Sequence, residues 1–174
     1  MIYYDFVTKS MMGDVLVAAT DKGLCAVILG RRTRNGFVKQ LMKMFPTQPV
    51  QRRPRVMKPY RQELADYFAG RRTEFTLPID LSAVHGPFQR RVLKRLSRLP
   101  FGRVISYGEL ATRAGSPRGA RAVGAAMAAN PMPVVIPCHR VIESRGKLGG
   151  YTGGVSMKKK LLTHEGVLTK TLSF

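Results

Sequence analysis

Residues 106–130, SYGELATRAGSPRGARAVGAAMAAN, predict two short helices joined by a tight turn. Ser106 followed three residues later by Glu109 is the pattern of a capping box, which predicts the start of the first helix. Ser116 and Pro117 predict the start of the second, with serine as the N-cap and proline as the first helical residue. Helix, tight turn and helix in this order are typical of a helix-turn-helix.

The second predicted helix carries mostly small side chains, with Arg118 and Arg121 near its start. Small side chains let a helix approach another surface closely, whether a neighbouring helix or the narrow minor groove of DNA. The positive end of the helix dipole favours anions at the place where the arginines lie. The two arginines therefore favour DNA over close packing of alanines.

The next segment, residues 130–141 (NPMPVVIPCHRV), places Cys138 between a proline and a histidine at the end of an apolar run. Proline fixes φ and lacks an N–H, so the segment is predicted to be stiff and non-helical. Such a cysteine beside an imidazole suits covalent thiol chemistry, with a thiol pKa below its ordinary value. The alternative is a buried core thiol, which we predict for Cys25 in the strand-like run 24–29.

An amphipathic helix is predicted upstream, starting near residue 86. Its apolar stripe is expected to face a core, and five cations fill the other faces: Arg90, Arg91, Lys94, Arg95 and Arg98.

Downstream, four glycines surround Tyr151 and Thr152 in residues 148–154, a loop that brings backbone against a ligand or is simply flexible. Ser156 is predicted to cap a last helix that Gly166 ends. Glu165 lies at the end of this helix, where the dipole disfavours a negative charge. Either an imidazolium or a surface lysine is expected to compensate it.

The first half predicts an α/β scaffold without catalytic spacing. We expect strands at 2–8, 14–20 and 24–29 with a tight turn at 21–23, helices near 37–45 and 59–70, a loop at 46–55 and a further strand at 73–79. The predicted fold is therefore an α/β domain with a small antiparallel sheet and helices at 1–82, followed by a mainly α domain with a helix-turn-helix at 83–174.

Charge and composition narrow the function. The net charge is +20 in 174 residues, and residues 83–174 hold 16 lysines and arginines against 3 acids, which favours a polyanion such as nucleic acid. No stretch resembles a signal peptide or a membrane span. The two cysteines are too far apart for a disulfide framework, so we expect a cytoplasmic protein that does not bind membranes.

Several motifs together resemble the O6-alkylguanine-DNA alkyltransferase family, also called methylated-DNA–protein-cysteine methyltransferases. They are PCHRV at 137–141, SY at 106–107, RGARAV at 118–123, GYTGG at 150–154 and HEG at 164–166. The resemblance covers residues 86–167, whereas the first half is similar only in size and in its order of strands and helices. It implies a ribonuclease-H-like first domain and a winged-helix-like second domain.

The family resemblance also implies an activity. Alkyl groups on O6-alkylguanine, and on O4-alkylthymine, would be transferred once and irreversibly to Cys138 after the base has been flipped out of double-stranded DNA. His139 would act as the base through a water, Glu165 would orient that histidine, and Tyr107 would protonate the leaving guanine. Such an enzyme is used up by one reaction, because a thioether has no hydrolytic exit.

The remaining roles follow from the same resemblance. Arg121 would fill the space left by the flipped nucleotide in the minor groove, beside Arg118, Ala120 and Tyr107. The substrate pocket would comprise Asn130, Pro133, Val141, Gly149, Tyr151 and Thr152. No metal, no other cofactor and no transcriptional role are expected, and the protein would act as a monomer, with cooperativity along DNA left open.

Two other classes of function remain as alternatives. A DNA-binding regulator would use the helix-turn-helix and leave Cys138 inert. A hydrolase with a Cys-His-Glu triad would turn over repeatedly.

Overall fold

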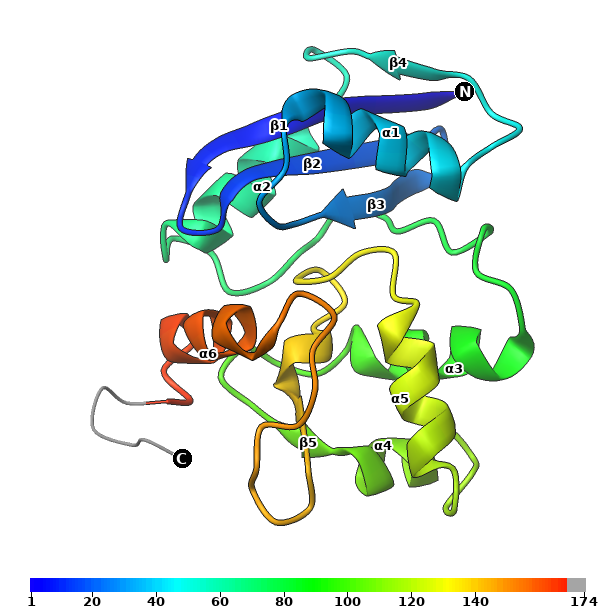
Figure 1. Ribbon diagram of the computed structural model, residues 1–174, viewed down its shortest axis with the longest axis vertical. Helices are drawn as coiled ribbons and strands as arrows, with labels where there is room; N and C mark the ends of the chain where they lie inside the picture. The colour runs from blue at the N-terminus through cyan, green and yellow to red at the C-terminus, as the bar shows by residue number, and fades with distance from the viewer. Residues whose placement is uncertain (169–174) are drawn as a thin grey trace. The chain divides into compact units, whose positions relative to one another are not determined.

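The computed structural model describes residues 1–168, and the chain forms two compact units, Met1–Ala83 and one that begins at Val84 (Figure 1). The predicted second domain extends to 174, so its residues 169–174 lie outside the described part. Within the described part, every helix is too short or too polar to cross a membrane.

The first unit is built on a four-stranded sheet of order β3-β2-β1-β4. Three strands form the predicted antiparallel meander: β1 (Ile2–Ser10), β2 (Gly13–Thr20) and β3 (Gly23–Ile28). Thr20 pairs with Gly23, so β2 and β3 are joined by the predicted tight turn.

The fourth strand corrects the prediction of a purely antiparallel sheet. β4 (Val50–Arg52) lies within the predicted loop 46–55 and pairs parallel with β1, Ile2 opposite Val50. The N–H of Ile2 donates to the carbonyl of Pro49 at 2.9 Å. The edge of β1 that does not pair with β2 offers backbone hydrogen-bonding groups, and this short segment pairs with them.

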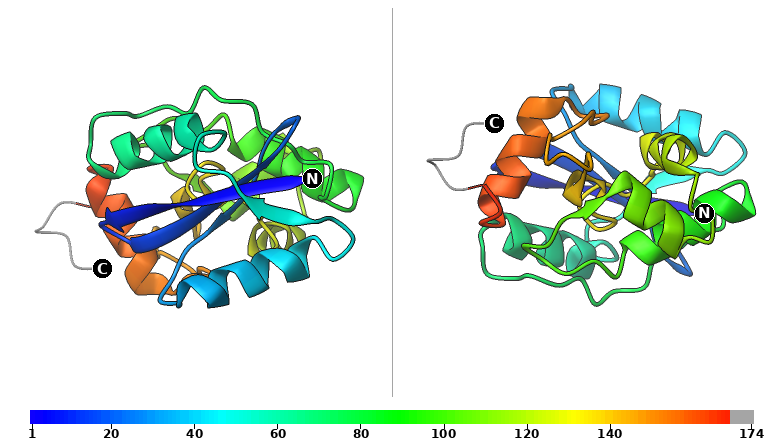
Figure 2. Two further views of the ribbon diagram at one scale, coloured as in Figure 1. Left: turned by 90° about the horizontal axis from the view of Figure 1, so that it is seen from above. Right: turned by 90° about the horizontal axis from the view of Figure 1, so that it is seen from below.

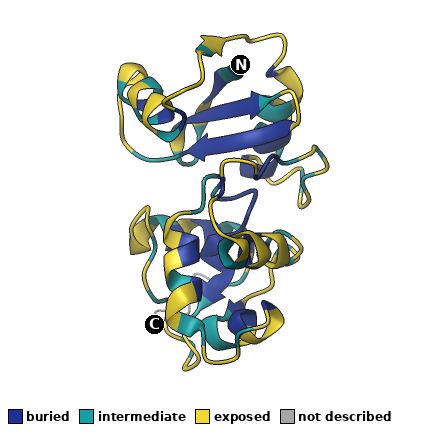
Figure 3. Cartoon of the chain, turned by 90° about the vertical axis from the view of Figure 1, so that its right-hand side faces the viewer, coloured by how far each residue is buried: buried dark blue, intermediate teal, exposed yellow. Residues whose placement is uncertain are grey.

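Helices α1 (Arg34–Met44) and α2 (Lys58–Phe68) cover opposite faces of this sheet (Figure 2). Phe37 and Leu41 of α1 are fully buried in the core, as their spacing predicts. Figure 3 shows that β2 and β3 are buried along most of their length.

The further strand predicted at 73–79 does not form, apart from an isolated parallel bridge between Leu24 and Ile79. The N–H of Leu24 donates to the carbonyl of Pro78 at 2.8 Å, and its carbonyl accepts from Asp80 N–H at 2.7 Å. Pro78 has no N–H with which to extend a ladder, so pairing stops there.

The second unit is mainly helical. It contains α3 (Pro87–Leu96), β5 (Ile105–Ser106), α4 (Tyr107–Arg113), α5 (Ala120–Ala128), a 3₁₀ turn (Cys138–Arg140), β6 (Val141–Ile142) and α6 (Val155–His164). β5 and β6 pair in parallel, which places the residue before α4 beside the segment that follows Cys138.

One predicted helix cap forms and two do not. The hydroxyl of Ser106 accepts from the N–H of Glu109 at 3.1 Å, as predicted. Ser116 instead belongs to a separate turn, closed by Gly119 N–H donating to its carbonyl, so α5 begins at Ala120. Ser156 lies inside the first turn of α6, because Gly154, with φ +87°, is the N-cap.

Gly23 supplies a test of the first unit. Its φ is +141°, and a Cβ there would lie 2.4 Å from the carbonyl oxygen of Pro78. We expect Gly23→Ala to lower the free energy of unfolding by about 3 kcal/mol or more, measured by urea denaturation. Gly13→Ala is the control, because its φ is also positive but no atom lies within 4 Å of the added Cβ. Equal losses in the two variants would contradict this reading of the Gly23 contact.

Candidate active site

Cys138 opens the single 3₁₀ turn that leads into β6, directly after Pro137. The sequence predicted a non-helical segment here, and this is wrong for Cys138–Arg140. Pro137 cannot lie inside a helix, but it permits one short helical turn to begin directly after it. Successive residues of a 3₁₀ helix point about 120° apart, so the side chains of Cys138 and His139 diverge. Only 8% of Cys138 is exposed.

Asn130 holds the segment before the cysteine. Its amide nitrogen donates to the carbonyl of Ile136 at 2.8 Å and to Sγ of Cys138 at 3.3 Å, and its oxygen accepts from Met132 N–H at 3.0 Å. Val134 within this segment has φ +78°, a conformation that costs a β-branched residue about 1–3 kcal/mol. The three hydrogen bonds of Asn130 help to hold this strained turn and therefore the position of the sulfur.

A buried charge cluster lies behind the cysteine. His139 Nε2 donates to Oε1 of Glu165 at 2.8 Å, and both side chains are fully buried. Arg140 donates from Nε and Nη2 to the two oxygens of the same carboxylate, each at 2.8 Å. Since an ionised carboxylate only accepts, the proton of neutral His139 is on Nε2, and Nδ1 has no partner among the described residues.

Burial favours a neutral histidine in this cluster. Burial lowers the pKa of His139 below its ordinary value, and although Glu165 raises it, Arg140 opposes that effect. The guanidinium pairs with both oxygens of the carboxylate, so the carboxylate has less charge left to stabilise an imidazolium.

The thiol pKa overturns one prediction from the sequence. Burial raises the pKa of Cys138 above its ordinary value, and hydrogen bonds from Asn130 and Tyr151 only partly oppose this. The neighbouring imidazole is neutral, and the charge of Lys158 lowers the thiol pKa by less than burial raises it. Cys138 is therefore a protonated thiol at neutral pH.

Lys158 is a functional candidate that the sequence analysis missed. It is fully buried on α6, and its ammonium donates to the carbonyls of Val141 at 2.6 Å, of Leu148, and of Gly150 at 3.4 Å. Burial lowers its pKa to about 8. Lys158 thus ties β6 to the glycine-rich loop. Its position in a run of three lysines gave no signal, because such runs are ordinarily exposed.

Tyr107, the first residue of α4, lies on the other side of the site. Its hydroxyl donates to the carbonyl of Gly150 at 3.5 Å. Burial, Glu143 and Cys138 raise its pKa, so the phenol keeps its proton at neutral pH.

A pocket of about 270 Å³ opens onto Cys138. Of the predicted residues, Tyr107, Tyr151 and Thr152 line it together with the cysteine. Four further lining residues were not predicted, namely Gly124, Met127 and Ala128 of α5 and Gly150. The three on α5 could have been found from their helical spacing, which places them on one face of the helix.

The remaining predicted pocket residues lie outside this lining. Val141 is buried in β6 and offers its carbonyl to Lys158. Gly149 lies against the Tyr107 ring, where a Cβ would be 3.3 Å from a ring carbon. Pro133 is half-buried and bridges to Ile136.

The residues predicted to contact DNA gather at the N-terminal end of α5. Ala120 is its first residue, Arg121 follows and is exposed, and Arg118 is exposed in the turn before the helix. Arg121 precedes Gly124 of the pocket wall by three residues, which is about one helical turn. Nowhere in residues 1–168 do three or more His, Cys, Asp or Glu side chains form a group that could hold a metal ion.

Two protein-family models match the chain. Residues 2–81 match the ribonuclease-like domain of 6-O-methylguanine DNA methyltransferase, and residues 87–167 match the DNA binding domain of the same protein. The first match extends the family resemblance to residues 2–81, where the motifs alone show only a similar size and order of strands and helices.

Individual relatives match large parts of the chain. The bifunctional transcriptional activator/DNA repair enzyme Ada of Escherichia coli is 36% identical over 88% of this chain and 43% of its own length. The methylated-DNA–protein-cysteine methyltransferase of Salmonella typhimurium is 50% identical over 61% of each chain. The chain therefore spans less than two thirds of either relative.

A solved structure matches nearly the whole chain. The crystal structure of Mycobacterium tuberculosis OGT in complex with DNA has a TM-score of 0.79 and 35% identity, covering 94% of this chain and 92% of that one.

The raised thiol pKa makes a prediction about pH. Because only the thiolate reacts, the rate of Cys138 alkylation by iodoacetamide should rise about tenfold per pH unit and show no plateau up to pH ~9. Peptide mapping separates Cys138 from Cys25, whose pKa burial raises to about 12 and which should stay unmodified. A plateau near pH 6–7 would show that the resting thiol is ionised.

Proposed function

The chain belongs to the 6-O-methylguanine DNA methyltransferase family, and we propose that it repairs alkylated DNA by direct reversal. The alkyl group of O6-alkylguanine, and of O4-alkylthymine, passes to Cys138. One observation carries this proposal: the single cysteine on the pocket adjoins a buried His139–Glu165 pair whose histidine has an unoccupied proton acceptor.

The reaction is an in-line displacement. Sγ of Cys138 forms a bond to the alkyl carbon while the bond from that carbon to O6 breaks, and its electron pair stays with the guanine. The thiol proton passes through a water to Nδ1 of His139, and Glu165 stabilises the imidazolium that forms. The phenol of Tyr107 supplies the proton that makes guanine a better leaving group.

The resting charges fit this order of events. A neutral His139 can accept a proton, and a protonated Tyr107 can donate one. Lys158 lowers the pKa of Cys138 through its charge, which favours the thiolate as it forms. The thioether product cannot be hydrolysed, so each molecule reacts once.

The nucleic-acid partner is double-stranded DNA. The N-terminal end of α5 enters the minor groove, where the small side chains of the helix permit close approach. The target base flips out into the pocket, at a cost of a few kcal/mol that is smaller for a weakly paired, damaged base. Arg121 occupies the space it leaves, because this exposed side chain lies one turn from the pocket wall.

The cellular compartment follows from the chemistry of the thiol. A nucleophilic thiol must stay reduced, which places the reaction in the cytoplasm. In this proposal the protein acts as a monomer.

The first test concerns the acceptor. After incubation with a duplex containing one O6-methylguanine, intact mass and peptide mapping should show one methyl group per protein, on Cys138. Cys138→Ser should bind the duplex but accept nothing, and Cys25→Ser is the matched control that should react normally. Methyl on Cys25, or repeated turnover by one molecule, would overturn the assignment; turnover would favour the hydrolase.

The second test concerns base flipping. Arg121→Ala should slow transfer from methylated duplex by roughly tenfold to a hundredfold, since extrusion costs a few kcal/mol. Transfer from free O6-benzylguanine should change little, because the free base needs no flipping. Arg145→Ala, an exposed arginine in the loop after β6, is the control. Equal losses on both substrates would show that Arg121 supports the pocket instead.

A further inference from the structure

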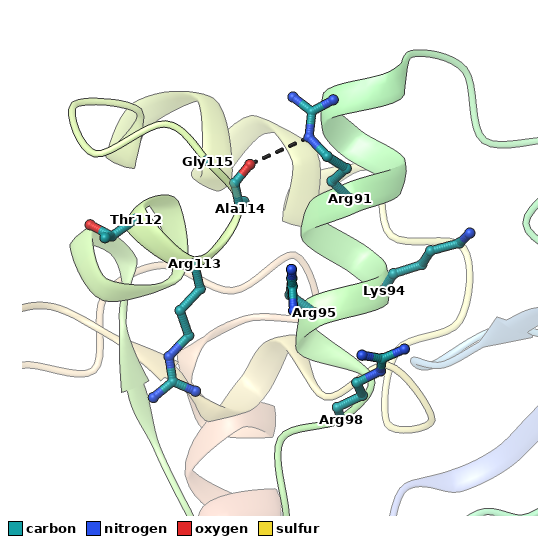
Figure 4. A pocket seen from close by; sticks show the side chains of 8 residues that line it. All are labelled: Arg91, Lys94, Arg95, Arg98, Thr112, Arg113, Ala114 and Gly115. Carbon is teal, nitrogen blue, oxygen red and sulfur yellow. Dashed lines mark hydrogen bonds between the residues drawn. The ribbon is translucent and has the colours of Figure 1, made fainter.

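A second hollow in the C-terminal unit is lined by cations (Figure 4). We call it the basic groove; its volume is about 550 Å³, and it lies between α3 and the C-terminal end of α4. None of its lining residues is acidic: Arg91, Lys94, Arg95, Arg98, Thr112, Arg113, Ala114 and Gly115. The Cys138 pocket shares none of them.

The cations of the groove are spaced as one helical face. Arg91, Lys94 and Arg95 lie on α3 at i, i+3 and i+4, Arg98 lies in the turn directly after the helix, and all four are exposed. The opposite face of α3 is buried through Val92, Leu93 and Leu96. The helix and the turn after it therefore present a positive stripe to solvent.

This positive charge is largely unbalanced. Among residues 1–168, Arg113 alone of the five cations forms an ion pair, with Glu109 at 2.5 Å. Like charges at i+3 and i+4 repel and weaken a helix. A negatively charged ligand would relieve this repulsion, which the protein itself does not do.

The shape of the groove favours a polyanion over a single small anion. Arg91 to Arg95 span about 6 Å of helix and Arg98 lies beyond its end, whereas successive phosphates of one DNA strand rise about 3.4 Å. The stripe therefore matches several phosphates in a row. The lining offers no aromatic or large apolar side chain on which a base could stack, so it suits phosphate contacts and not base contacts.

The groove is continuous with the surface assigned to DNA. Gly115 lines it and directly precedes the turn 116–119, which carries Arg118 and leads into α5. α4 connects the two sites, with Tyr107 at the Cys138 pocket and Arg113 at the groove.

We propose that the basic groove binds the phosphate backbone of the duplex that α5 enters, beside the segment holding the damaged base. This inference rests on the proposed function and adds a second DNA contact that is independent of sequence and of damage. It holds the protein on undamaged DNA and leaves discrimination to the Cys138 pocket.

The test neutralises the groove. The triple variant Lys94→Gln, Arg95→Gln, Arg98→Gln is compared with Lys39→Gln, Lys43→Gln, Arg55→Gln, which removes three exposed cations from the first unit. Fluorescence anisotropy measures binding to an undamaged 24-base-pair duplex between about 50 and 200 mM KCl. Thermal unfolding checks that both variants are folded, and transfer from free O6-benzylguanine checks the pocket.

The groove variant should bind the duplex roughly tenfold more weakly or worse, and the slope of log affinity against log salt should fall by about 2–3, near 0.9 per lost phosphate contact. The control variant should keep both. Equal effects in the two variants, or an unchanged slope in the groove variant, would overturn the inference. The inference would also be overturned if the groove variant bound the duplex as the parent does but no longer bound phosphatidylserine vesicles that the parent binds. Failure of the parent protein to react with O6-benzylguanine would instead overturn the proposed function.

Discussion

The shared carboxylate of Glu165 is the contact on which the rest of the site depends. It is buried and accepts hydrogen bonds from His139, from Arg140 and from the N–H of Gly102 at 3.3 Å. These donors come from the 3₁₀ turn and from the loop before β5, whereas Glu165 caps the end of α6. Removing one partner of a buried ion pair typically costs several kcal/mol, so the pairing holds three separate segments in one arrangement.

Burial of this part of the site sets the resting charge of the nucleophile and its histidine. It keeps the Cys138 thiol protonated and favours a neutral His139, and Arg140, which occupies both carboxylate oxygens, adds to the effect on the histidine. Oxidation follows thiolate character and exposure, so a buried, protonated Cys138 is protected from it. In the proposed reaction, the departing base accepts the proton of Tyr107 as the thiol gives up its own.

Short patterns in the sequence predict much of the local structure correctly. The features that they do not predict depend on contacts between residues far apart in the chain. The meander of the first unit and the Ser106 cap follow from short patterns. β4 could not be predicted, because it depends on the free edge of β1. Lys158 was missed although it precedes the buried Leu161 and Leu162 by three and four residues, because a lysine on the buried face of a helix is rare and its carbonyl partners come from distant segments. The thiol pKa was predicted in the wrong direction because burial is not visible in a sequence.

The neutral resting state of the Cys138–His139 pair is the central claim of this account. It is tested most directly by ¹⁵N NMR of His139 in the unreacted protein across pH 5–8, with His139→Gln to assign the signals. The account predicts a neutral imidazole at pH 7, protonated on Nε2 and unprotonated on Nδ1, with a pKa below the ordinary ~6.5. An imidazolium at pH 7, with both nitrogens protonated, would contradict it.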